Sequence, residues 1–142
     1  MAWIVANIRW IMIVSGGLTA TMIYAAIAPA AALRSTFGET LEGPLAELVV
    51  RNWGVLITLV GAMLIYGAFD SATRRLTLIV AGVSKTVFIG LVLSQGGRYL
   101  GRQAGLAIAI DLVMVLLFTW YLLAARGVKQ PAASVTSSAA SV

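Results

Sequence analysis

Four long apolar runs constrain this chain more than any other feature of its sequence. They cover residues 10–28, 53–69, 76–93 and 106–123, and each is close to the ~20 residues that a helix needs to cross a bilayer. The runs are apolar on nearly all faces, whereas a helix at the surface of a soluble protein keeps one polar side. They predict an all-α polytopic membrane protein, a four-helix transmembrane bundle.

Charged residues are too few to cover a water-soluble surface. The 142 residues include five acids and ten bases, so 11% are charged, against about 25% in soluble domains. The net charge of +5 lies at the ends of the apolar runs, where bases meet lipid headgroups, and no basic cluster with interleaved aromatic residues exists. We therefore expect membrane lipids as partners, and no nucleic acid.

Cysteine and histidine are both absent. Disulfides, thiolate zinc sites and histidine acid–base chemistry are thereby excluded. The chain also lacks a pairing of nucleophile and base of the kind that marks a hydrolase or transferase. We expect no metal, no cofactor and no enzymatic activity.

The chain divides into one transmembrane domain, residues 1–125, and a tail, residues 126–142. The tail consists mainly of small and polar residues without periodicity, which predicts disorder. The first run ends in an A-x-A pattern, but Pro29 follows it, so we expect it to be retained rather than cleaved. The second helix has an alternative start at Pro44, because proline suits the first helical turn.

The positive charges favour one orientation. With four spans, both termini lie on the same side of the membrane. By the positive-inside rule we expect cytoplasmic termini, by five bases to four. The terminal side holds Arg9, Arg74, Arg75, Arg126 and Lys129, and the opposite side holds Arg34, Arg51, Arg98 and Arg102.

Lys85 and Asp111 interrupt the third and fourth runs. A charge at the bilayer centre costs ~2.5–3.5 kcal/mol on insertion scales, so neither side chain is expected to face lipid. Counted from the end that the two runs share, their depths differ by roughly 4.5 Å, which a lysine side chain spans. We predict an intramembrane ion pair. It either fixes how the helices pack or belongs to a path for a substrate, ion or proton.

Small residues recur every four positions in the third run, at Gly82, Thr86 and Gly90. Such spacing makes a smooth groove that another helix approaches closely. The groove serves either as a dimer face or as ordinary packing inside the bundle. Similar sets in the first and second runs are interpreted as packing faces: Ser15, Thr19 and Met22, and Gly54, Thr58 and Gly61.

Arg98 and Arg102 stand four residues apart in the connection between the third and fourth runs. On a helix both guanidinium groups would point the same way and together hold a phosphate or carboxylate. The alternative is that both simply reach lipid phosphates at the membrane surface.

The span layout, the long polar first connection and the stretches Arg51-Asn52-Trp53-Gly54 and Ser84-Lys85-Thr86 resemble the small bacterial four-helix membrane families, of which DoxX-like proteins are one. The resemblance covers about residues 4–125. It implies a bacterial inner-membrane protein and carries over no catalytic residue.

Three functions remain in view. The first is a non-enzymatic accessory or assembly partner that acts through helix contacts, as a homo-oligomer or with another membrane protein. The second is a small oligomeric transporter or channel that uses Lys85 and Asp111. The third is a redox subunit that handles a lipid or quinone near Arg98 and Arg102. A buried water path beside Lys85 would favour transport, whereas a dry pair enclosed by the bundle would favour the accessory role.

Overall fold

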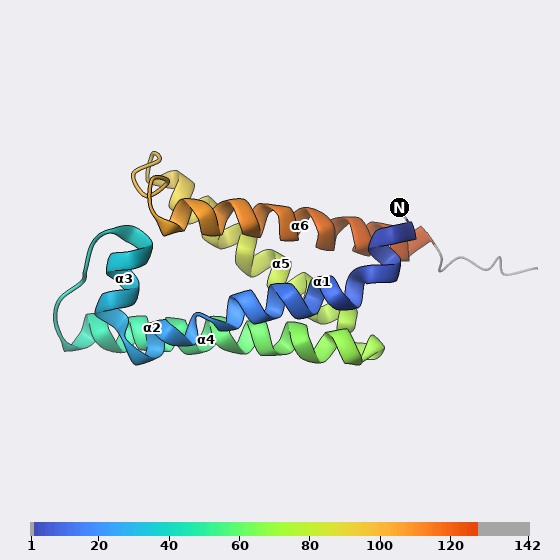
Figure 1. Cartoon of the computed structure of the whole chain (residues 1–142), viewed down its shortest axis with the longest axis horizontal. Coiled ribbons are helices and arrows are strands. Elements are labelled where there is room, and N and C mark those ends of the chain that lie inside the picture. The colour runs from blue at the N-terminus through green and yellow to red at the C-terminus, as the bar shows by residue number, and fades with distance from the viewer. Residues whose placement is uncertain (1, 128–142) are drawn as a thin grey trace, which may run out of the picture.

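The computed structural model describes residues 2–127, and all regular secondary structure in that range is helical. The helices are α1 (Ala2–Ala20), α2 (Ile23–Ile27), α3 (Pro29–Phe37), α4 (Pro44–Phe69), α5 (Ser71–Ser94) and α6 (Gln103–Gly127). Within these residues four stretches are long and apolar enough to cross a membrane: α1 together with α2, then α4, α5 and α6. The protein is an integral membrane protein built as a four-helix bundle (Figure 1).

The helices are longer than the apolar runs of the sequence. The second span begins at Pro44, the alternative start, and the third begins at Ser71 rather than at residue 76. A helix continues for as long as its backbone hydrogen bonds do, so polar residues at its ends are included. The expected tail began at residue 126, but residues 126 and 127 form the end of α6, and residues 128–142 lie outside the described part of the chain.

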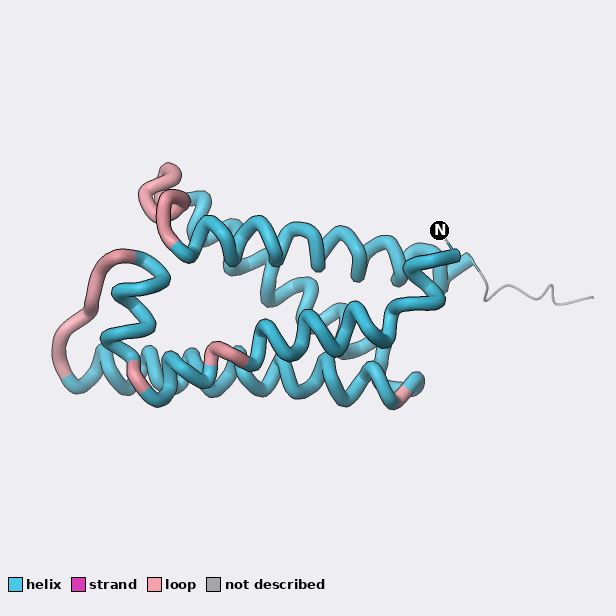
Figure 2. Tube along the Cα trace, in the orientation of Figure 1, coloured by secondary structure: helices cyan, strands magenta, loops and turns pink. Residues whose placement is uncertain are grey.

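Successive spans run antiparallel, so the two ends of the bundle differ (Figure 1). One end, here called the terminal end, holds the start of α1, the end of α6 and the connection at Asp70. The other, the loop end, holds α3 and the turns of residues 95–102, and most of the loop segments in Figure 2 are there.

Glycines bring α1 and α2 into backbone contact with α4. A Cβ atom on Gly61 would lie 2.6 Å from the carbonyl oxygen of Gly16, and one on Gly54 would lie 2.6 Å from the amide nitrogen of Ala26. No side chain fits at either position, so these two glycines fix how closely the helices approach. The packing face expected for Gly54 and Gly61 is confirmed.

Arginine side chains hold carbonyl groups that the helix ends leave without a backbone donor. Arg51 of α4 donates to the carbonyl oxygens of Ala26 and Ile27, next to the break between α2 and α3, and forms an ion pair with Glu47. At the terminal end, Arg74 donates at 3.1 Å to the carbonyl oxygens of both Gly67 and Ala68, which close α4.

Besides two smaller clusters nearer the loop end, the hydrophobic core has its largest cluster at the terminal end. Its buried members come from all four spans and include Met12, Leu64, Leu78 and Phe118. Nearer the loop end, no core of this kind fills the space between the α1–α4 pair and the α5–α6 pair. A cavity lies there instead.

Candidate functional site

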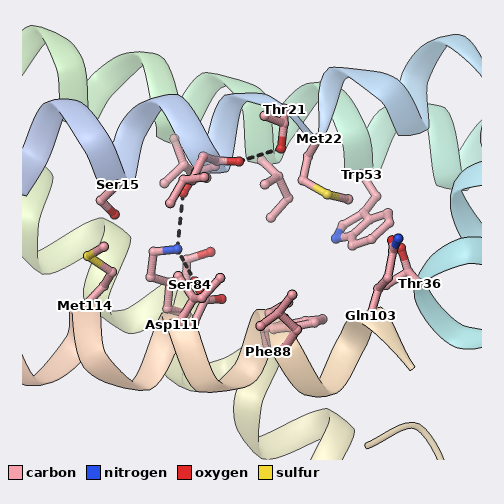
Figure 3. A pocket seen from close by; sticks show the side chains of 18 residues that line it. Ser15, Thr21, Met22, Thr36, Trp53, Ser84, Phe88, Gln103, Asp111 and Met114 are labelled. Atoms are coloured by element: carbon pink, nitrogen blue, oxygen red, sulfur yellow. Dashed lines mark hydrogen bonds and ion pairs between the residues drawn. The ribbon is translucent and has the colours of Figure 1, made fainter. Parts of the chain in front are cut away.

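The structure brings Lys85 and Asp111 together. The amine of Lys85, on α5, forms an ion pair with the carboxylate of Asp111, on α6 (Figure 3). The Lys85 amine also donates a hydrogen bond to the hydroxyl oxygen of Thr19 on α1, at 3.2 Å. Lys85 is 8% exposed, so three spans meet at one buried charged group. The spacing of Thr19 predicts a packing face and gives no sign of its role as a hydrogen-bond acceptor.

A cavity of about 320 Å³ lies against this ion pair. Its walls come from every span and from α3, and are mostly apolar. At one end Ser15 and Met114 face each other across it, with Lys85 and Asp111 beside them. Figure 3 shows Thr36 and Gln103 at the opposite end, toward the loop end of the bundle. Its volume lies at the low end of the ~300–1,000 Å³ of small-molecule sites.

Helix α1 is interrupted where it borders the cavity. The amide of Thr21 is shared between the carbonyl oxygens of Gly17 and Leu18, both at 3.3 Å, and the amide of Met22 donates to Thr19. This is a local change from four-residue to three-residue hydrogen bonding, a 3₁₀ turn, which often marks a functional segment within a helix. Thr19, Thr21 and Met22 all line the cavity, so the irregular backbone stands at its wall.

Ser15 is the polar group that stands out. It is 1% exposed, it lines the cavity, and among the described residues its hydroxyl has no hydrogen-bond partner. A buried hydroxyl without a partner costs about 1–3 kcal/mol. Sequence reasoning placed Ser15 on a packing face with Thr19 and Met22, and spacing alone gives no sign of an unpaired hydroxyl.

A second hollow of about 340 Å³, here called the outer groove, lies near the loop end, between α3, α4, α5 and the turns that follow α5. It is lined almost entirely by apolar residues, among them Val49 and Leu91, which are more than half exposed. Trp53 and Phe88 line both this groove and the central cavity. These two aromatic side chains therefore form a shared wall between the cavity and the lipid-facing surface.

The groove predicted at Gly82, Thr86 and Gly90 faces away from the bundle. Thr86 is exposed and donates to the carbonyl oxygen of Gly82 at 2.8 Å. A Cβ atom on Gly82 or Gly90 would meet no atom within 4 Å. The interpretation as packing inside the bundle was wrong, because four-residue spacing identifies a face of a helix without saying which way that face points.

Arg98 and Arg102 do not form a two-pronged site. They lie in consecutive turns at residues 95–102 rather than on one helix, so their spacing does not align them. Arg98 forms an ion pair with Glu39 at 2.6 Å, and both side chains are at least half exposed. The Arg102 side chain lies against Gly38, whose left-handed backbone ends α3. The two arginines thus tie the last turns before α6 to the connection between α3 and α4.

No protein-family model, curated protein or solved structure matches this chain. The resemblance to DoxX-like proteins therefore stays an expectation from the sequence. Within residues 2–127, no group of three acidic side chains is placed to hold a metal ion.

Proposed function

We propose that this protein is a non-enzymatic membrane protein that binds a small molecule in the central cavity and transports it. The observation that carries the proposal is the position of the Lys85–Asp111 pair, on the wall of a cavity of about 320 Å³. An ion pair that only fixed helix packing would be stabilised best when fully enclosed by side chains, because an adjoining empty space removes packing contacts.

The interruption of the first span supports the same proposal. In transporters, broken helices line substrate sites near the middle of the membrane, because the irregular backbone is tolerated only where it faces a cavity or protein. The 3₁₀ turn at Thr21 and Met22 faces the cavity in this way, in the part of the first span nearer the loop end.

The proposal includes a location and an orientation. We place the protein in a bacterial inner membrane with both termini in the cytoplasm, which follows from the excess of bases at the terminal end. The cavity then extends toward the outer face, because it reaches Thr36 and Gln103 at the loop end. A reporter fused to the C-terminus is expected to be active only in its cytoplasmic form, and activity of a periplasmic reporter there would reverse the orientation.

Two alanines on α6 provide the test of binding. Ala107 lines the cavity, whereas Ala109, two residues along, is exposed on the outer surface. Ala107→Phe fills the cavity, and Ala109→Phe adds the same side chain against lipid. We expect native mass spectrometry to find molecules that co-purify with the wild type and Ala109→Phe, and not with Ala107→Phe. The same molecules on all three proteins would refute binding in the cavity.

The accessory role is a second candidate, supported by the outward-facing groove at Gly82, Thr86 and Gly90. Lipid or another helix covers this face, and small residues favour a helix. Gly82→Leu with Gly90→Leu should reduce the oligomer size in detergent, or remove a co-purifying membrane protein, without unfolding the bundle. An unchanged composition in both respects would leave the groove without a partner.

A further inference from the structure

The groups at the end of the cavity where Ser15, Lys85 and Asp111 lie restrict the charge of its ligand. Lys85 is already paired with Asp111 and bonded to Thr19, so the wall carries no net charge there. A charged ligand would have to break this pair or remain uncompensated in a largely apolar space, and an uncompensated buried charge is strongly unfavourable. An uncharged ligand enters without either cost.

Ser15 identifies the polar group that such a ligand carries. Its hydroxyl is buried on the cavity wall and has no partner among the described residues. A serine hydroxyl both donates and accepts, so it pairs best with another hydroxyl or a similar group. A ligand hydroxyl at this position would give the Ser15 oxygen the hydrogen bond that the chain itself does not provide.

The volume sets the size of the ligand. A cavity of about 150 Å³ lined by apolar side chains holds one benzene molecule. This cavity has about 320 Å³, roughly twice as much, which corresponds to two fused rings or a chain of similar bulk. Most of the lining surface is apolar, although Thr36 and Gln103 stand at the loop end, so most of the remainder of the ligand is apolar as well.

The outer groove indicates where the ligand comes from. It is apolar, Val49 and Leu91 in its lining are more than half exposed, and it shares Trp53 and Phe88 with the central cavity. A ligand dissolved in the lipid that enters this groove reaches the cavity by displacing these two side chains. This favours an amphiphile that partitions into the bilayer.

We infer that the cavity takes an uncharged, lipid-dissolved amphiphile that carries one hydroxyl, has an apolar part about the size of two fused rings, and bonds through its hydroxyl to Ser15. The inference rests on the proposed binding function and adds the chemical class of the ligand. Bromonaphthol and bromonaphthalene are matched probes, because they differ by the hydroxyl and their bromine quenches tryptophan fluorescence. Bromonaphthoate supplies the same rings with a negative charge.

Trp53 is the reporter, because it lines the cavity. The other three tryptophans, Trp3, Trp10 and Trp120, are 45–67% exposed and are replaced by phenylalanine. Quenching is measured in nanodiscs, with probe concentrations corrected for partition into empty nanodiscs. We expect bromonaphthol to bind about three- to tenfold more tightly than bromonaphthalene, the value of one net hydrogen bond.

Two serine variants separate the hydroxyl contact from general effects. Ser15→Ala removes an unpaired buried hydroxyl, so it should fold normally and abolish the preference for bromonaphthol. Ser84→Ala, on the same cavity wall but less buried, should keep it. A preference that survives Ser15→Ala, or that disappears with Ser84→Ala, overturns the assignment of Ser15.

The remaining outcomes separate a failure of the predicted ligand class from a failure of the proposed function. If both neutral probes bind equally and Ala107→Phe blocks both, the cavity binds ligands but the hydroxyl preference is wrong. If bromonaphthoate binds most tightly, the ligand is an anion and the inference fails. If Ala107→Phe leaves the quenching of Trp53 by every probe unchanged, the probes occupy only the outer groove and the proposed function fails as well.

Discussion

Replacing Lys85 and Asp111 by leucine, singly and together, tests whether the two charges stabilise each other. Lys85 is 8% exposed and the Asp111 side chain 16% exposed, so water screens neither well. Each single substitution leaves one buried charge without its partner, which in buried pairs costs ~3–5 kcal/mol. The double substitution leaves no charge at all.

The size of the loss depends on the contacts that remain for the charge left behind. Lys85 keeps its hydrogen bond to Thr19 when Asp111 is removed. We therefore expect the loss in Asp111→Leu to fall toward the lower end of the ~3–5 kcal/mol range.

The assay is the free energy of unfolding in mixed detergent micelles, followed by helical circular dichroism. Thr119→Leu is a matched control on α6, because Thr119 is exposed and its loss should cost little. We expect the double variant to lose less than either single variant. If the losses of the two single variants add in the double variant, the residues do not stabilise each other and the reasoning is refuted.

Three further predictions concern stability. Gly61→Ala should cost about 1–3 kcal/mol through overpacking against Gly16, whereas Gly90→Ala, in open space, should gain about 0.5–1 kcal/mol; equal thermal shifts would contradict this. Arg51→Leu should cost about 1 kcal/mol or more, because it leaves two carbonyl groups without their donor. In the same unfolding assay, Arg51→Lys should recover only part of the lost stability, because a lysine amine cannot reproduce the forked donors of a guanidinium group. Hydrogen bonds from the Ala72 amide and from the Thr73 side chain hold the pKa of Asp70 below its ordinary value. Its contribution to stability should therefore be present at neutral pH and disappear as pH falls through that lowered pKa, and Asp70→Asn should remove this part of the pH dependence of unfolding.

The depth of the charged residues in the membrane could be predicted from the sequence, whereas the direction in which each helix face points could not. The contact of Lys85 with Asp111 follows from two costly charges at similar depth in neighbouring antiparallel spans. Thr19 as a third partner does not follow, because an uncharged threonine in an apolar run carries no cost that predicts which helix it faces. The outward face of Gly82 and Gly90 was unpredictable for a related reason. In lipid, a glycine face and a leucine face are both permitted outside, so hydropathy does not orient the helix.

The cavity itself leaves no trace in the sequence. It is the volume that remains between side chains after Gly16, Gly54 and Gly61 have drawn α1, α2 and α4 together at one side of the bundle. The unpaired state of Ser15 depends on that volume as well. The sequence would be the same if Ser15 were packed against a neighbouring helix and donated to a free carbonyl group there.

The Lys85–Asp111 contact also has a consequence for biosynthesis. The two residues are 26 positions apart, and ribosomes add ~5–20 residues per second, so Asp111 is made about 1–5 s after Lys85. During that interval α5 carries an ammonium group whose carboxylate partner does not yet exist. We expect the translocon to retain α5 until α6 has been made. Thr19 has already been made by then, so its hydroxyl is available to Lys85 before Asp111 exists.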